Sequence, residues 1–125
     1  MIQGIGIDMI EVERVADRIS KKEGFKELVF SEREIAYCES KANQFEHYAA
    51  RFAAKEAFFK ALGTGWKNGT AFNEVEIIDN EAGKPEVYLL GATAETVKAM
   101  HVGNIMVSLS HLKTMATAMI IIEQS

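Results

Sequence analysis

Four charged side chains interrupt an apolar stretch near the middle of the chain, and they are its strongest chemical signal. Residues 49–62 have the composition of the last turns of a long helix, which Gly63 is suited to end. Apolar side chains cover almost the whole circumference of this helix, as is typical of a buried one. The charges within it are Arg51, Lys55, Glu56 and Lys60. Because an unpaired buried charge is very costly, they predict a cavity or cleft beside the helix.

An ordinary ion pair is the simplest explanation for two of these charges. Glu56 and Lys60 are four residues apart, and an exposed pair at that spacing contributes about 0.2–0.5 kcal/mol. The spacing alone leaves this explanation open beside a functional role for both residues.

A second carboxylate with unusual neighbours lies near the N-terminus. Residues 2–8 alternate in the manner of a strand, which places Gly4, Gly6 and Asp8 on one face. Glycines there leave space beside the carboxylate for a ligand or for another backbone. Alternatively, Asp8 is the N-cap of the next helix, with Glu11 completing a capping box. The third glycine of a dinucleotide-binding fingerprint is missing, so that interpretation is rejected.

The elements that must position these residues follow from periodicity and capping signals. We expect helices over residues 9–19, 25–30, 31–38, 43–62 and 92–100, and strands over residues 2–8, 73–78, 86–90, 104–110 and 115–123. Ser31 and Glu34 form a capping-box pattern, and the turn at residues 111–114 predicts an antiparallel hairpin. Helices come mostly first and strands mostly second. This order predicts an α+β fold in which an antiparallel sheet packs against the long central helix.

Composition limits the class of protein. The chain has 125 residues, which is the size of one domain spanning residues 1–125, with 48% hydrophobic and 26% charged residues. Its net charge of −4 argues against nucleic-acid binding. A single Cys38 and the lack of a signal-peptide pattern predict the cytoplasm. The longest apolar segment, residues 115–122, is far shorter than the ~20 residues of a membrane span, so no membrane insertion is expected.

Basic residues gather in the region after Asp8. They are Arg14, Arg18, Lys21, Lys22 and Lys26. Acidic residues at positions 11, 13, 17 and 23 dilute them, so a solvated surface is the alternative to a binding face.

Three segments together resemble one family, in the same order along the chain. They are Gly4-Ile-Gly6-Ile-Asp8 with Arg14, then Arg51-Phe-Ala-Ala-Lys55-Glu56-Ala-Phe-Phe-Lys60-Ala-Leu-Gly63-Thr64-Gly65, and finally Ser108-Leu-Ser110-His111. The chain resembles the holo-acyl-carrier-protein synthases, the small bacterial type of 4′-phosphopantetheinyl transferase. The resemblance covers essentially the whole chain, including the Gly83-Lys84-Pro85 turn, and is weakest over residues 22–48. The central segment is its most specific part.

The resemblance implies an activity and a set of roles. Enzymes of this family transfer phosphopantetheine from coenzyme A to a serine of apo acyl carrier protein, in support of fatty acid biosynthesis. They release adenosine 3′,5′-bisphosphate and use Mg²⁺. Asp8 and Glu56 match the metal-ligand positions, and with Lys60 they are the expected catalytic residues, Glu56 being the preferred base through a bound water. Two carboxylates suit Mg²⁺, which is usually held by one or two carboxylates together with substrate phosphates.

Further residues are assigned to ligands by the same resemblance. Those expected to bind coenzyme A are Arg51, Lys55, Lys60, Gly63, Gly65, Lys84, Pro85 and His111. The basic residues at positions 14, 18, 21, 22 and 26 are the expected docking surface for the acidic carrier protein. The resemblance also implies a homotrimer with each site shared between subunits.

Two alternatives define what must be tested. A Ser110–His111 hydrolase pair is excluded, because adjacent strand residues point to opposite faces and no nucleophile-elbow motif is present. A non-catalytic module that binds coenzyme A or a carrier protein is the other function class. The two carboxylates favour the enzyme, because a simple binder has no need of a carboxylate in an apolar helix.

Overall fold

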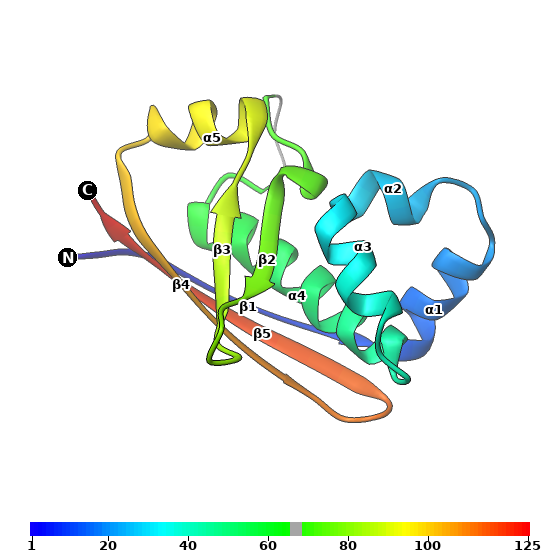
Figure 1. The fold of residues 1–125 in the computed structure, drawn as a ribbon. Helices are drawn as coiled ribbons and strands as arrows, with labels where there is room; N and C mark the ends of the chain where they lie inside the picture. The colour runs from blue at the N-terminus through cyan, green and yellow to red at the C-terminus, as the bar shows by residue number, and fades with distance from the viewer. Residues whose placement is uncertain (66–68) are drawn as a thin grey trace.

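A long central helix, α4, packs on a three-stranded antiparallel sheet, and a two-stranded hairpin lies beside the helix and reaches the sheet at β4 (Figure 1). The computed structural model describes residues 1–65 and 69–125. Its helices are α1 (Val12–Ser20), α2 (Phe25–Val29), α3 (Glu32–Glu39), α4 (Gln44–Leu62) and α5 (Gly91–Lys98), with a short 3₁₀ helix η1 (Phe72–Glu74). Its strands are β1 (Ile2–Glu11), β2 (Val75–Asp79), β3 (Pro85–Leu89), β4 (Val102–His111) and β5 (Met115–Gln124).

The predicted α+β fold is confirmed, with every expected helix and strand present. The larger sheet has the order β1-β5-β4, and the β2–β3 hairpin forms a separate sheet. Ser31 caps α3 in the predicted capping box with Glu34. Gly63 ends α4 in the left-handed conformation, with φ of 81°, which glycine adopts without steric cost.

The first strand is longer than predicted, and this excludes Asp8 as the N-cap of α1. β1 continues to Glu11, and α1 begins only at Val12, with no side-chain capping bond from Glu11. Asp8 therefore lies inside a strand, paired with Ala118 of β5, and the alternative of a capping box is wrong. The sheet provides β1 with hydrogen bonds that a helix starting at residue 9 would give up.

Close packing of β1 on α4 explains the two glycines. A Cβ atom at Gly4 or Gly6 would overlap the backbone carbonyl oxygens of Ala61 and Ala57, respectively. The space beside the glycines is therefore filled by the backbone of α4 and not by a ligand. The close approach brings Asp8 beside the last two turns of the helix.

Two apolar clusters hold α4 in place. One packs the second half of α4 against β2, β5 and α5, with Phe58, Ile77 and Ile120 fully buried. The other surrounds its first half with α1, α2 and α3, including Tyr48 and Cys38. Burial raises the pKa of the Cys38 thiol to about 12, so this group is inert as a nucleophile. Among the helices described, none is long and apolar enough to cross a membrane.

Candidate active site

Lys60 bridges α4 and β1 at the point where Asp8 lies. Its Nζ donates hydrogen bonds to Asp8 Oδ1 at 2.8 Å and to the carbonyl oxygen of Ile7 at 3.0 Å. Within residues 1–65 and 69–125, no ion pair joins Lys60 to Glu56, so the simple pair one turn apart on the helix is not formed. The lysine side chain is 55% exposed and remains accessible to a ligand.

Glu56 lies close enough to Asp8 for the two carboxylates to interact electrostatically. Burial, and next the negative charge of Asp8, raise the pKa of the Glu56 carboxyl group above its ordinary value, and the charge of Lys60 offsets this only in part. Asp8 pairs with Lys60, whereas Glu56 forms no ion pair among the described residues. The pair therefore fits a divalent cation that prefers oxygen ligands.

A cavity of about 330 Å³ opens beside the two carboxylates, and we call it the carboxylate cavity. Asp8, Arg14, Arg18, Phe25, Phe52 and Glu56 are among the residues that line it. The two arginines are one turn apart on α1 and place positive charge next to the carboxylates. The arginines suit the phosphate groups of a ligand. They also suit the acidic surface of a protein partner.

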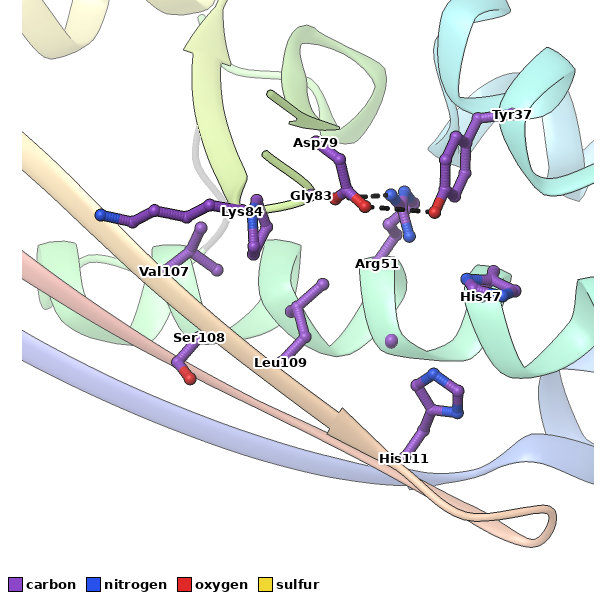
Figure 2. Close-up of a pocket in the computed structure, with 12 residues that line it drawn as sticks. Tyr37, His47, Arg51, Asp79, Gly83, Lys84, Val107, Ser108, Leu109 and His111 are labelled. Carbon is purple, nitrogen blue, oxygen red and sulfur yellow. Dashed lines mark hydrogen bonds and ion pairs between the residues drawn. The ribbon is translucent and has the colours of Figure 1, made fainter. Parts of the chain in front are cut away.

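A second cavity of about 380 Å³ lies on the other side of α4, and we call it the hairpin cavity. Its walls come from α3, α4, β4 and the turn between β2 and β3 (Figure 2). Tyr37, His47, Arg51, Lys84, Pro85 and His111 are among its lining residues. Four of the residues predicted to bind coenzyme A therefore meet here, although they are widely separated in the sequence.

Arg51 is the most constrained side chain of the hairpin cavity. Only 2% of it is exposed, and its Nε donates to the carbonyl oxygen of Ile77 at 3.2 Å. Its Nη2 donates to Asp79 Oδ1 at 3.3 Å, and the guanidinium lies 4.3 Å from the ring centre of Tyr37. The Tyr37 hydroxyl donates to the other oxygen of Asp79 (Figure 2). A rigid guanidinium is thus presented to the cavity.

Sequence reasoning missed several residues of this cavity. Tyr37, His47 and Asp79 come from three different elements, and Glu46 reaches the cavity only through His111. His47 lies four residues before Arg51 and so shares its helix face, a spacing that could have identified it. Tyr37 and Asp79 carried no such signal, because their meeting depends on how α3 and β2 pack.

Lys55 does not lie in either cavity, and its predicted contact with coenzyme A is wrong. The side chain is 0% exposed and donates to Glu34 Oε1 at 2.8 Å. It also donates to the carbonyl oxygens of Phe72 and Val75, so all three of its N–H groups are used. Lys55 instead ties α4 to α3, η1 and β2.

The remaining predicted residues divide between several places. Gly63 and Gly65 lie at the C-terminal end of α4, line neither cavity and both have positive φ. Arg14 and Arg18 line the carboxylate cavity, and Lys21 shares a neighbouring depression with Arg18. Lys22 and Lys26 line a different depression, where Lys26 pairs with Glu39 at 2.9 Å. The expected basic face is therefore split into two parts.

The two cavities lie at opposite edges of the larger sheet. The carboxylate cavity adjoins β1, the hairpin cavity adjoins β4, and β5 lies between these strands. Arg51 and Glu56 are five residues apart, which places them about 140° apart around α4. The two cavities share no lining residue.

Sequence comparison identifies relatives over the full length of the chain. A family model described as the 4′-phosphopantetheinyl transferase superfamily matches residues 4–114. A protein named holo-[acyl-carrier-protein] synthase from Cytophaga hutchinsonii is 47% identical over all of both chains. One of the same name from Solibacter usitatus is 42% identical and covers 98% of this chain and 99% of its own.

Solved structures agree in fold as well. The holo-[acyl-carrier-protein] synthase of Neisseria meningitidis superposes with a TM-score of 0.91 at 28% identity, covering 99% of this chain and 100% of its own. The synthase of Bacillus anthracis in complex with CoA (3′,5′-ADP) gives a TM-score of 0.82 at 33% identity, with 100% and 99% covered. This chain therefore belongs to the 4′-phosphopantetheinyl transferase superfamily, as a holo-[acyl-carrier-protein] synthase.

Proposed function

We propose that the chain transfers 4′-phosphopantetheine from coenzyme A to a serine of apo acyl carrier protein in the cytoplasm, in support of fatty acid biosynthesis. Adenosine 3′,5′-bisphosphate leaves, and the reaction depends on Mg²⁺. The observation that carries this proposal is the meeting of Asp8, Glu56 and Lys60 beside a cavity with two arginines. Two carboxylates that would hold Mg²⁺, together with a lysine, suit the pyrophosphate of coenzyme A.

Asp8 and Glu56 are the proposed metal ligands. Among the described residues, no group of three or more histidine, cysteine, aspartate or glutamate side chains is placed to hold a metal. Mg²⁺ fits a site with two carboxylates, because it commonly keeps waters and takes substrate phosphates as further ligands. When bound, it would neutralise charge on the pyrophosphate of coenzyme A. Burial, and next the negative charge of Asp8, raise the pKa of Glu56, and a bound cation would balance that charge.

Lys60 is the proposed stabiliser of charge on the transferred phosphoryl group. Its Nζ is held by Asp8 and the Ile7 carbonyl, which aims it at the carboxylate pair. A lysine in that place can donate to a phosphate oxygen without moving its backbone. The attacking serine belongs to the carrier protein, so this chain contributes positioning and electrostatics.

The nucleotide part of coenzyme A is assigned to the hairpin cavity. Arg51, Lys84 and His111 bring three basic side chains to it, and Pro85 and Tyr37 provide apolar surface. Arginine and lysine side chains are common ligands for phosphate groups. The cavity therefore suits the 3′-phosphate and the ribose that carries it.

The separation of the two cavities supports a homotrimer with shared sites. Within one chain, β5 separates them, whereas a second copy packed along the sheet can place its hairpin cavity next to the carboxylate cavity of the first. The outer sheet face is suited to such packing. Its cross-strand rows are Ile5–Ile121–Met106, Ile7–Met119–Ser108 and Met9–Thr117–Ser110. Ile5, Ile7 and Met9 are each about 60% exposed, an apolar patch typical of an interface.

A charged residue on this outer face is expected to dissociate the trimer. In Ile5→Lys, the lysine would enter an apolar interface, so the mass measured by light scattering should fall from trimer to monomer and transferase activity should fall with it. Leu28→Lys, at another exposed apolar position, on α2, should leave the mass unchanged. A wild-type monomer that is fully active would contradict the shared site.

The activity itself is tested by mass spectrometry of the carrier. The chain is incubated with coenzyme A, Mg²⁺ and an apo acyl carrier protein, and the carrier is then weighed. A gain of one phosphopantetheine, absent when Mg²⁺ is chelated, is the expected result. A carrier that binds but gains no mass would identify the chain as a non-catalytic binding module.

Carrier docking is expected to depend on the part of the basic face near the carboxylates. Arg18→Glu should raise KM for the carrier about tenfold or more and reduce its dependence on salt, while KM for coenzyme A changes less than twofold. Lys26→Glu is the matched control, because Lys26 lines another depression and is paired with Glu39. Equal losses in both variants would show that the whole basic region, and not its α1 part, receives the carrier.

A further inference from the structure

Glu46 contacts His111 but is not among the residues that line the hairpin cavity. Its Oε1 is 2.9 Å from Nδ1 of His111, across a sequence separation of 65 residues. Within the described part of the chain, this is the one hydrogen bond that the Glu46 side chain makes. Glu46 is in the first turn of α4, and His111 is the last residue of β4. His111 lines the cavity and Glu46 does not, so any effect of Glu46 on a ligand passes through the imidazole.

The contact determines which nitrogen of the ring carries a proton. An ionised carboxylate only accepts hydrogen bonds, so Nδ1 of His111 must carry a hydrogen. The ring is then either the Nδ1–H neutral tautomer or the imidazolium ion. In both forms Nε2, on the opposite edge of the ring, is the nitrogen left to the cavity. Figure 2 shows the His111 ring at the end of β4, facing His47 on α4.

A phosphate ligand distinguishes between these two forms. Neutral His111 would turn the Nε2 lone pair towards an anionic oxygen, whereas the imidazolium donates an N–H to it. The carboxylate of Glu46 balances the extra charge. The other titratable or charged groups of the cavity are Tyr37, His47, Arg51, Asp79 and Lys84. Burial, and next the charge of Arg51, lower the pKa of His47, so the neighbouring histidine does not supply a second cation.

We propose that Glu46 is a positioning residue for the nucleotide end of coenzyme A: it orients His111 through Nδ1 and stabilises the imidazolium whose Nε2–H donates to a phosphate oxygen. This inference rests on the proposed function, because it takes the ligand of the hairpin cavity to be a nucleotide phosphate. Supporting hydrogen bonds of this kind commonly set the orientation and charge of a histidine.

The sign of one measurement separates this role from a simple field effect. Glu46→Gln removes a negative charge near an anion site, which by itself would tighten binding of an anion. Positioning predicts the opposite: the dissociation constant for adenosine 3′,5′-bisphosphate, measured by calorimetry, should rise about tenfold. KM for coenzyme A should rise by a similar factor, with kcat at saturation little changed. Glu81→Gln, an exposed carboxylate of the β2–β3 turn, controls for the field and should not weaken binding.

A double-mutant cycle and ¹⁵N NMR of the His111 ring provide the remaining tests. His111→Gln keeps an N–H donor but cannot be charged, so Glu46→Gln should have no further effect in that background. In wild type, ¹⁵N NMR of His111 should show a protonated Nδ1 without ligand, and Glu46→Gln should shift the ring towards the Nε2–H tautomer that free histidine prefers.

Unchanged or tighter bisphosphate binding by Glu46→Gln, or an additive cycle, would overturn the proposal. A wild-type chain that binds no bisphosphate would instead overturn the proposed function, and the tautomer result would still stand.

Discussion

Glu56→Gln is expected to lower transferase turnover by about three orders of magnitude at any Mg²⁺ concentration. Glutamine has the same size and fills the same space, so the packing of α4 beside the carboxylate cavity is preserved. The variant loses one of only two carboxylates proposed to hold the cation, and a neutral amide is a much weaker ligand for Mg²⁺. Near-normal turnover at matched Mg²⁺ would remove the metal-site assignment.

A thermal shift tests the same site without turnover. Mg²⁺ with coenzyme A should raise the Tm of wild type, because a ligand that binds only the folded state stabilises it. The shift should be much smaller for Glu56→Gln. Equal shifts in both proteins would contradict the role of Glu56 as a ligand.

Without Mg²⁺, Glu56→Gln should be more stable than wild type. Burial, and next Asp8, raise the pKa of Glu56 in the folded state above its ordinary value of 4.5. When the pKa of a carboxyl group is higher in the folded state than in the unfolded state, its ionisation lowers the free energy of unfolding. This loss is absent below the ordinary pKa and grows as the pH rises through the raised one. With a chelator present, Glu56→Gln should therefore melt above wild type at pH 7, and the difference should close near pH 4.

Lys60→Met is expected to lower kcat by about two orders of magnitude, equivalent to roughly 3 kcal/mol of barrier. KM for coenzyme A should change less, because the lysine is assigned to charge that develops during transfer. The structure sharpens this prediction, since Nζ already lies 2.8 Å from Asp8 Oδ1 and can also orient a metal ligand. Loss of either role lowers kcat.

Stability separates these roles from plain structural pairing. The Lys60 side chain is 55% exposed, and an exposed ion pair contributes at most about 1 kcal/mol, so Lys60→Met should melt close to wild type. Lys98→Met, an exposed lysine in the last turn of α5, is the matched control and should keep full activity. A Lys60→Met protein with near-normal kcat would show that the lysine only ties α4 to β1.

Local patterns along the chain predicted the elements well. Period-two alternation, the Ser31 capping box and Gly63 after α4 are short-range signals, and each acted as predicted. The start of α1 was predicted three residues early, because the pairing of β1 with β5 extends the strand to Glu11. Long-range hydrogen bonds there outweigh a local capping pattern.

The sequence by itself determined which residues could do chemistry: Asp8, Glu56 and Lys60 stand out by type and by their apolar setting. Only the tertiary structure decided their partners, because those depend on contacts between distant segments. Lys60 pairs with Asp8 across 52 residues and not with Glu56 one turn away. Lys55, one residue before Glu56, points into the core towards Glu34, because a 100° step around α4 separates a cavity wall from the packed interior. Spacing along one helix cannot reveal which of its faces another element covers.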